Sequence, residues 1–160
     1  MGLALSSLQI QSNAFNDGDN IPVRYTHFGD DISPQLEWHS LPKEARSLVL
    51  FCHDPDAPKI VPGYYGFLHW LVYNIPADVN GMEEGCSLYT QAANDFGAIG
   101  YGGPKPPENH GIHRYYFWLV ALDLPPELPP IMEFENLFKV IEPNVVGMNR
   151  LTGLFQHTKS

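Results

Sequence analysis

The sequence has few charged residues, few basic residues and no long apolar run, and each shortage excludes a class of protein. Charged residues make up 17 % of the 160 positions, and 9 Lys and Arg face 18 Asp and Glu, so the formal net charge is −9. This balance argues against wholesale binding to nucleic acid or to an anionic membrane, because both require a basic face. Any anion must therefore be held by a local group of residues.

Cysteine is also scarce. Cys52 and Cys86 are the two cysteines, and Cys52 ends an apolar stretch in which a buried free thiol is the commonest case. We therefore expect two unpaired thiols and a reducing compartment. Residues 1–7 lack the basic and apolar regions of a signal peptide, and no apolar run approaches the ~20 residues of a membrane span. These features predict a cytoplasmic protein.

The chain is long enough for one packed domain and too short for two. A domain of this size buries about two-thirds of the surface that its unfolded chain exposes, so it needs no metal or disulfide to support its core. The sequence contains 14 glycines and 15 prolines, which makes it rich in turns. We predict a single domain over residues 1–160.

Short apolar runs between clusters of Pro, Gly, Asn and Asp predict a mainly β fold. The predicted strands are Leu3–Ile10, Val23–Phe28, Ser47–His53, Phe67–Asn74 and Tyr115–Leu122, with a last strand at Arg150–Phe155. The runs Ser47–Cys52 and Tyr115–Leu122 are nearly continuous in apolar residues, which is typical of central strands buried on both faces. The pattern favours a β-sandwich of antiparallel sheets.

One helix is predicted near the C-terminus. Apolar residues recur at helical spacing within residues 130–142, where Pro129 and Pro130 lie at the start and Pro143 ends the run. Its expected role is to cover one side of a sheet. Ala77–Glu84 is assigned one short helical turn.

The first of three segments that could carry chemistry follows the strand at Ser47–His53. Pro55 and Pro58 restrict the backbone, so Asp54 and Asp56 are held in place where the strand ends. A pair of carboxylates at the end of a sandwich is a candidate binding site. The alternative is an Asx-type turn that only caps the strand.

The second segment places His69 inside an otherwise apolar strand. A lone histidine in a core is more often a structural hydrogen-bonding group than a functional one. A functional role for His69 therefore depends on a partner from another segment.

The third segment, Tyr101–Tyr115, supplies such partners. Glycines and prolines give a rigid loop whose exposed backbone N–H groups could form an anion-binding hollow. The loop leads into a strand that starts with His113, Arg114 and Tyr115. Alternation places Arg114 on the opposite side of the strand from the other two, where we expect it to brace a carboxylate of another loop.

Together these segments predict a small anion pocket at one end of the sandwich. An aspartate beside a histidine favours the imidazolium form, so we expect anion affinity to fall as the pH rises through the histidine range. The three segments contain no serine and no cysteine in their loops, which argues for a non-catalytic binding protein. The alternative is a metal-dependent phosphoester hydrolase that uses the same histidines and aspartate, although His110 and His113 are too close in sequence to be convincing joint ligands.

Several sequence boxes resemble the phosphatidylethanolamine-binding protein family, also called Raf kinase inhibitor-like proteins. They are DPDAP at Asp54–Pro58, GxxHW at Gly66–Trp70 and YGGPxPPxxxGxHRYxF at Tyr101–Phe117. The stretches AFNDGDNIPVRYT and SPQLEW are similar to the bacterial and archaeal branch. The resemblance extends from about Leu8 to Phe155.

The resemblance implies a Greek-key β-sandwich with a phosphate-binding pocket and without metal or cofactor. By position, the residues implied to line the pocket are Asp54, His69, His113 and Tyr115, those that shape its rim are Gly103, Pro106 and Pro107, and the one that supports it is Asp56. It further implies a phosphate- or carboxylate-bearing ligand, a homodimer and modulation of a kinase or protease. Lys105 departs from the family pattern and places a cation at the rim, where it could either strengthen anion capture or obstruct a bulky head group.

Overall fold

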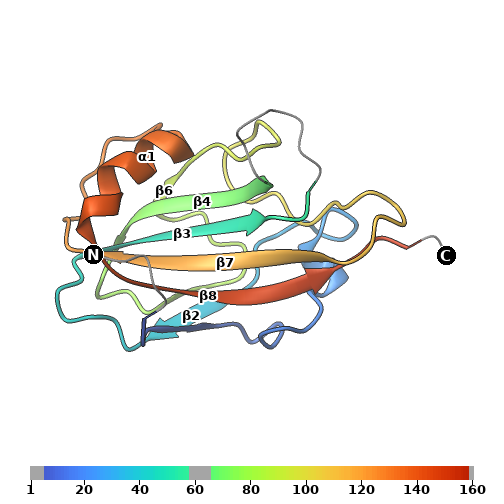
Figure 1. The fold of residues 1–160 in the computed structure, drawn as a ribbon, viewed down its shortest axis with the longest axis horizontal. Helices are drawn as coiled ribbons and strands as arrows, with labels where there is room; N and C mark the ends of the chain where they lie inside the picture. Colours follow the sequence, from blue (N-terminus) through green and yellow to red (C-terminus); the bar gives the residue numbers. More distant parts are fainter. Residues whose placement is uncertain (1–5, 58–65, 159–160) are drawn as a thin grey trace.

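The computed structural model describes residues 6–57 and 66–158, which form two antiparallel sheets and one α-helix (Figure 1). The smaller sheet has the order β1–β2–β5, with strands Gln9–Gln11, Leu36–His39 and Gly81–Met82. The larger sheet has the order β6–β4–β3–β7–β8, with strands Thr90–Gln91, Phe67–Pro76, Ser47–Asp54, His113–Leu122 and Val145–Phe155. The prediction of a mainly β fold is confirmed.

The two runs predicted as central strands are β3 and β7, which pair with each other in the middle of the larger sheet. The smaller sheet covers one face of this sheet, and helix α1 (Phe134–Ile141) covers one end of the other face (Figure 1). Successive side chains of a strand point to opposite faces. Leu48 and Leu50 of β3 pack toward the smaller sheet, whereas Val49 and Phe51 pack toward the helix. This explains why these runs are nearly continuous in apolar residues.

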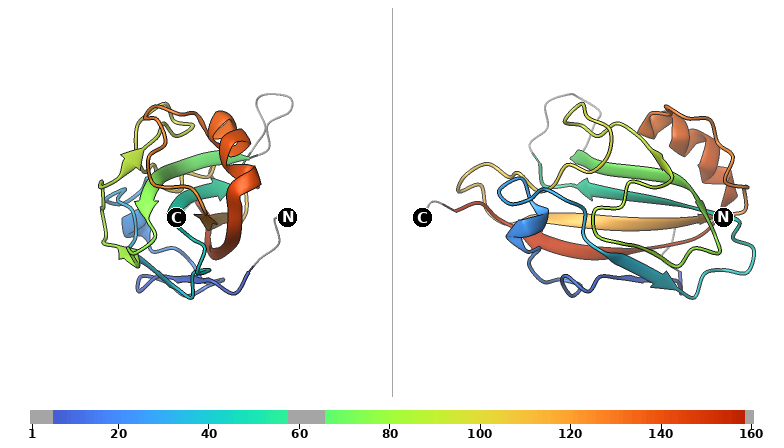
Figure 2. Two further views of the ribbon diagram at one scale, coloured as in Figure 1. Left: turned by 90° about the vertical axis from the view of Figure 1, so that its left-hand side faces the viewer. Right: turned by 180° about the vertical axis from the view of Figure 1, so that it is seen from behind.

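The larger sheet lies between the smaller sheet and the helix α1 (Figure 2). Between the sheets, Trp38 of β2 joins Trp70 of β4 and Phe117 of β7 in one core. On the other face, Leu137 and Ile141 of α1 are fully buried in a second core. The helix covers the end of the sheet opposite the C-terminus (Figure 1).

The predicted C-terminal helix is confirmed, but it is shorter than residues 130–142. It spans Phe134–Ile141, because Glu133 is still extended and Ile131 adopts a left-handed backbone conformation with φ of 63°. A short 3-10 helix at Glu142–Asn144, in which Pro143 occupies the first turn, connects α1 to β8. The last strand begins at Val145 and is therefore longer than predicted.

Two predicted elements are wrong. Val23–Phe28 is not a strand: Val23–Tyr25 forms a 3-10 turn, and the Thr26 hydroxyl donates to the Val23 carbonyl and accepts from the Phe28 amide. Such local side-chain bonds compete with strand pairing. Ala77–Glu84 is not a helical turn, because Gly81 and Met82 pair with β2 as β5.

The N-terminal strand is Gln9–Gln11, which extends one residue beyond the predicted Leu3–Ile10, and Leu3–Leu5 lie outside the described residues. Cys52 and Cys86 are both free thiols, as predicted, and Cys52 is completely buried. In the described parts of the chain, no helix has the length and apolar character that a membrane span requires.

Candidate functional site

A cavity of about 200 Å³ opens at the end of the larger sheet where β3 ends and β4 and β7 begin. Its walls come from segments that are far apart in the sequence. Six of the eight predicted site residues line it, namely Asp54, His69, Pro106, Pro107, His113 and Tyr115. The other lining residues are Ala57, Phe67, Phe96 and Lys105. The three segments singled out in the sequence therefore meet at one hollow.

Buried Asp54 and His113 form the polar floor of this cavity. His113 Nδ1 donates to Asp54 Oδ2 over 2.7 Å, and both side chains are almost inaccessible to solvent. The second carboxylate oxygen, Oδ1, accepts a 2.7 Å hydrogen bond from the Asp56 amide. Burial raises the pKa of Asp54 above its ordinary value, although the His113 bond opposes this shift. The two hydrogen bonds satisfy a carboxylate that is otherwise costly to bury.

His113 also contacts a second histidine. Its Nε2 lies 2.7 Å from Nδ1 of His110, so one of the two nitrogens donates to the other. Both ring nitrogens of His113 are thus engaged, one by Asp54 and one by His110. A ligand can reach His113 Nε2 only by displacing the exposed His110.

Asp56 supports the site from outside and does not line the cavity. Its carboxylate accepts three hydrogen bonds from Arg114, from the backbone amide, Nε and Nη2, at 2.8, 2.9 and 2.7 Å. The guanidinium holds the pKa of Asp56 below its usual range. The expectation that Arg114 braces a loop carboxylate is confirmed, and this brace fixes the turn that carries Asp54.

His69 is neutral and has a defined tautomer. Its Nδ1 lies 2.7 Å from the carbonyl oxygen of Gly102, so Nδ1 carries the proton and donates. Burial lowers the pKa of His69 from 6.5 to about 4. In this tautomer the other ring nitrogen, Nε2, carries a lone pair, and the side chain lines the cavity. The group that His69 offers to a ligand is therefore a lone pair, so His69 does not supply the imidazolium that was expected to attract the anion.

Tyr115 contributes an unpaired hydroxyl. The residue is fully buried, and its hydroxyl has no hydrogen-bond partner in the described structure. Burial, reinforced by the negative charge of Asp54, raises the pKa of Tyr115 well above 10, so the phenol keeps its proton. A buried hydroxyl without a partner costs about 1–3 kcal/mol. A ligand in the cavity would remove that cost.

The amides of Gly102 and Gly103 are not available to form the expected anion-binding hollow. The Gly102 amide donates to the His69 carbonyl, and the Gly103 amide donates to Asp31 Oδ1 over 2.7 Å. Gly103 does not line the cavity either. A Cβ at this position would lie 2.4 Å from the Tyr25 carbonyl oxygen, so the glycine is needed for close packing of the loop against residues 23–31.

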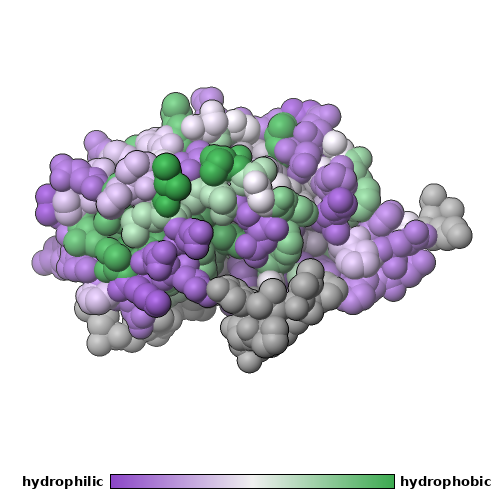
Figure 3. Space-filling model, turned by 90° about the horizontal axis from the view of Figure 1, so that it is seen from above, coloured by the Kyte–Doolittle hydropathy of each residue, from purple (hydrophilic) through white to green (hydrophobic). Residues whose placement is uncertain are grey.

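The walls above the floor are apolar and carry one cation. The Phe96 ring lies 4.6 Å from the Phe67 ring and 5.4 Å from the His69 ring, centre to centre, and Phe96 is 44 % exposed. Lys105 is exposed and lines the cavity, as expected for a rim residue. The cavity therefore combines a polar floor with apolar walls. Elsewhere on the surface, the space-filling view in Figure 3 shows apolar residues among hydrophilic ones on the side of the molecule that carries α1.

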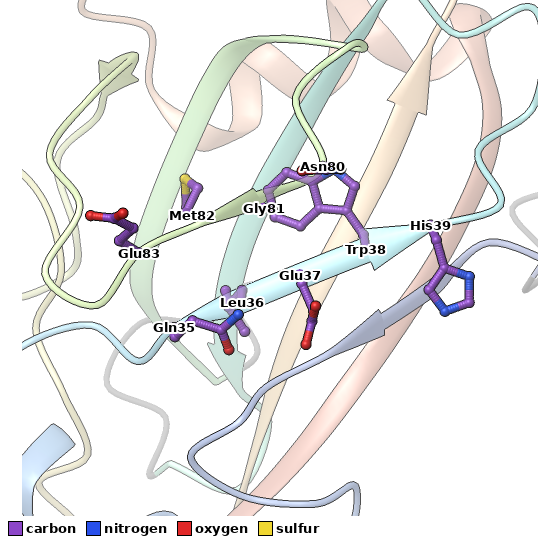
Figure 4. Close-up of a pocket in the computed structure, with 9 residues that line it drawn as sticks. All are labelled: Gln35, Leu36, Glu37, Trp38, His39, Asn80, Gly81, Met82 and Glu83. Carbon is purple, nitrogen blue, oxygen red and sulfur yellow. The ribbon is translucent and has the colours of Figure 1, made fainter.

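A second, larger depression follows the smaller sheet and has a volume of about 490 Å³. Figure 4 shows Gln35, Glu37 and His39 side by side along one side of β2. They do not converge on a common point, and the buried Trp38 has its indole nitrogen bonded to the Val79 carbonyl. The smaller cavity is the better candidate site, because only there do buried polar groups meet.

No group of three metal-ligating side chains is arranged around a common point in residues 6–57 and 66–158. At the cavity, Asp54 and His113 are bonded to each other and His113 is also bonded to His110. This arrangement does not favour the alternative of a metal-dependent hydrolase.

The family model for phosphatidylethanolamine-binding protein matches residues 11–156. The chain belongs to this family. A UPF0098 protein of Methanothermobacter thermautotrophicus is 42 % identical over 156 residues, which cover 93 % of this chain and 99 % of the relative. The family resemblance seen in the sequence boxes is thus confirmed.

Solved structures of the phosphatidylethanolamine-binding protein family have the same fold. A homologue from Chlamydia trachomatis is 36 % identical, with a TM-score of 0.86 and coverage of 93 % of this chain and 97 % of that one. YbcL of Escherichia coli, described as a new member of the mammalian family, is 28 % identical with a TM-score of 0.84, over 94 % and 99 % of the chains. A Plasmodium vivax member at 18 % identity and a TM-score of 0.60, over 97 % and 87 %, shares the fold.

Sequence reasoning missed the aromatic wall of this family member's cavity. Phe96 lies in a segment without clear periodicity, within a turn held by Asn94, whose side-chain oxygen accepts from the Phe96 and Ala98 amides. The Asn-Asp-Phe-Gly sequence indicates a turn that exposes its aromatic residue. Nothing in it shows that the ring packs beside Phe67, 29 positions earlier. Pro58, which was expected to restrain Asp56, lies outside the described residues.

Proposed function

We propose that this protein is a non-catalytic binding protein that holds the phosphate or carboxylate group of a small ligand in the cavity at the end of the larger sheet. The unpaired Tyr115 hydroxyl carries this proposal, because Tyr115 lines the cavity and a ligand there could provide the acceptor that this buried donor lacks. Asp54 and His69 flank this donor within the same cavity.

The apolar walls add a second requirement for the ligand. Phe67 and Phe96 lie above the polar floor, and Lys105 supplies a positive charge at the rim. A ligand that fits these features has an anionic head at the floor and a flat or apolar group that packs against the rings. Phenyl phosphate is a suitable probe, because it carries both parts.

Calorimetric titration of phenyl phosphate tests the site. We expect Tyr115→Phe, His69→Ala and His113→Ala each to weaken binding at least ~10-fold, since each removes or displaces a polar group of the floor. Tyr73→Phe is the matched control, because Tyr73 is equally buried but its hydroxyl is bonded to the Pro129 carbonyl, far from the cavity lining. Undiminished binding in the three site variants would rule out this cavity as the binding site.

The hydrolase alternative has its own test. Metal analysis of protein purified without a histidine tag, followed by incubation with phenyl phosphate, measures both the metal content and phenol release. We expect less than one metal ion per chain and no phenol release above the buffer rate. Stoichiometric metal together with turnover would overturn the proposal of a non-catalytic protein.

The proposal extends to the oligomeric state and the protein partners of this chain. We propose that the chain acts in the cytoplasm as a single domain over residues 1–160, forms a homodimer, and modulates a kinase or protease through a phosphorylated or carboxylate-bearing ligand. Light scattering distinguishes a monomer of 18.0 kDa from a dimer of twice that mass. A single cooperative unfolding transition is expected for one domain. Kinase and protease assays with and without the protein test the modulation.

A further inference from the structure

We infer that the cavity binds its phosphate ligand as the protonated monoanion, in which the P–O–H group donates its hydrogen to His69 Nε2. This inference rests on the proposed function, because it specifies the ionisation state of the ligand that the same cavity takes. It follows from the hydrogen-bonding capacity of each polar group at the floor.

The tautomer of His69 decides what this residue offers to a ligand. Because Nδ1 donates to the Gly102 carbonyl over 2.7 Å, Nε2 carries a lone pair toward the cavity. A fully ionised phosphate has only acceptor oxygens, so its oxygens would face this lone pair without a hydrogen between them. A protonated phosphate supplies the missing hydrogen.

The other polar groups at the cavity also favour a ligand with a single negative charge. Asp54 is a buried carboxylate whose two oxygens already accept hydrogen bonds from His113 and from the Asp56 amide. Its negative charge repels a dianion more strongly than a monoanion. The available donors are the Tyr115 hydroxyl and the Lys105 ammonium at the rim. These two donors can bond to oxygens of a ligand with charge −1, while the lone pair of His69 Nε2 accepts the one hydrogen that this ligand carries.

Protonation of His69 itself is the alternative source of that hydrogen. The charged and titratable groups facing His69 come from β3, from β7 and from the loop at the rim, and they are His53, Asp54, His113, Tyr115 and Lys105. Burial opposes the imidazolium most strongly, and the neighbouring His53 and His113 oppose it further. The proton is therefore held more readily by the phosphate, whose second pKa is about 6.

A matched pair of ligands tests this inference. Phenyl phosphate as a monoanion and phenyl sulfate have the same shape and charge, but only the phosphate carries an O–H donor. By calorimetry at pH 5, one unit below the second pKa of about 6, phenyl phosphate is mostly the monoanion. We expect it to bind at least ~10-fold more tightly there, because a site built around a hydrogen bond rejects the analogue that lacks it. Equal affinities would overturn the inference while leaving the anion site intact. Failure of both ligands to bind would overturn the proposed function, and the inference with it.

Proton uptake gives an independent readout that needs no variant. At pH 8 the free phenyl phosphate is a dianion, so binding as a monoanion takes up about one proton per complex. Titrations in two buffers of different ionisation enthalpy measure this number directly. Affinity should also fall about tenfold between pH 7 and pH 8, since both values lie above the second pKa of the ligand. Binding at pH 8 without proton uptake would show that the dianion is the bound form.

Two variants separate the hydrogen bond from general charge attraction. Lys105→Gln removes the rim cation, so we expect it to weaken both ligands by a similar factor and to leave their ratio unchanged. In His69→Gln the carboxamide can turn its N–H₂ toward the ligand, so the ratio of the two affinities should fall toward one. A ratio that stays high in His69→Gln would assign the phosphate preference to another residue.

Discussion

The unpaired hydroxyl of Tyr115 leads to a prediction about stability whose sign differs from that of most core substitutions. Removing the hydroxyl in Tyr115→Phe keeps the ring and its packing, and the small space left behind joins an existing cavity. Folding transfers this hydroxyl from water to a site without a partner, which costs about 1–3 kcal/mol. We therefore expect the ligand-free variant to match the wild type or to gain up to about that amount of unfolding free energy.

The same chemical change at Tyr73 should lower the free energy of unfolding. Tyr73 is also fully buried, but its hydroxyl donates to the Pro129 carbonyl over 2.6 Å and accepts from the Met132 amide over 3.2 Å. Removing it leaves both backbone groups without this partner. We expect a loss of about 1–3 kcal/mol, which is a fall of roughly 2–4 °C in melting temperature per kcal/mol for a chain of this length.

Urea denaturation of the wild type and both variants measures this difference. The buffer should contain Tris and chloride only, because phosphate, sulfate or carboxylate could occupy the cavity and stabilise the wild type. The unfolding free energies should order as Tyr115→Phe at or above the wild type and Tyr73→Phe below it. If Tyr115→Phe loses more than about 1 kcal/mol, the hydroxyl has a partner in the free protein and the reasoning fails.

Three further predictions concern residues around the cavity. Folding lowers the pKa of His69 from 6.5 to about 4, so between these pH values the imidazole binds a proton in the unfolded chain but not in the folded one. The free energy of unfolding should therefore fall by about 1.4 kcal/mol per pH unit as the pH drops from 6.5 toward 4. A series of denaturation curves at different pH should show that His69→Gln lacks this dependence. Gly103→Ala should lose at least about 2 kcal/mol of unfolding free energy, since its Cβ would lie 2.4 Å from the Tyr25 carbonyl oxygen, and a neutral result would show that the loop can move away. Arg114→Gln should lose less than about 1 kcal/mol, because its bond to Asp56 is partly exposed, yet calorimetry should show weaker ligand binding; unchanged affinity would mean that the Asp54 turn holds without this brace.

The sequence was informative wherever burial alone decides the structure. The runs that became β3 and β7 are recognisable because a strand covered on both faces must be apolar at every position. Val23–Phe28, in contrast, mixes apolar and polar residues, and Thr26 uses its hydroxyl to hold a turn there. Local hydrogen bonding therefore outweighs a strand-like pattern where a segment has no neighbouring strand to pair with.

For the site, the sequence predicted most of the residues that line the cavity, but it did not predict which of them donate and which accept hydrogen bonds. Whether His69 presents a proton or a lone pair depends on the Gly102 carbonyl, 33 positions away, and no pattern within the strand encodes that contact. The same holds for the amides of Gly102 and Gly103, which bond to residues outside their own loop. Residue types identify a polar cavity, whereas the direction of each hydrogen bond requires the fold.

The charge of the whole molecule and the chemistry of the cavity favour the same form of ligand. A net charge of −9 repels anions at long range, and repulsion is stronger for a dianion than for a monoanion. At short range Asp54 discriminates in the same direction, and Lys105 is the one formal cation among the described residues that line the cavity. Salt screens the long-range part but barely affects the buried part. The preference for phenyl phosphate over phenyl sulfate should therefore persist in 0.5 M sodium chloride, because it depends on a single hydrogen at His69 Nε2.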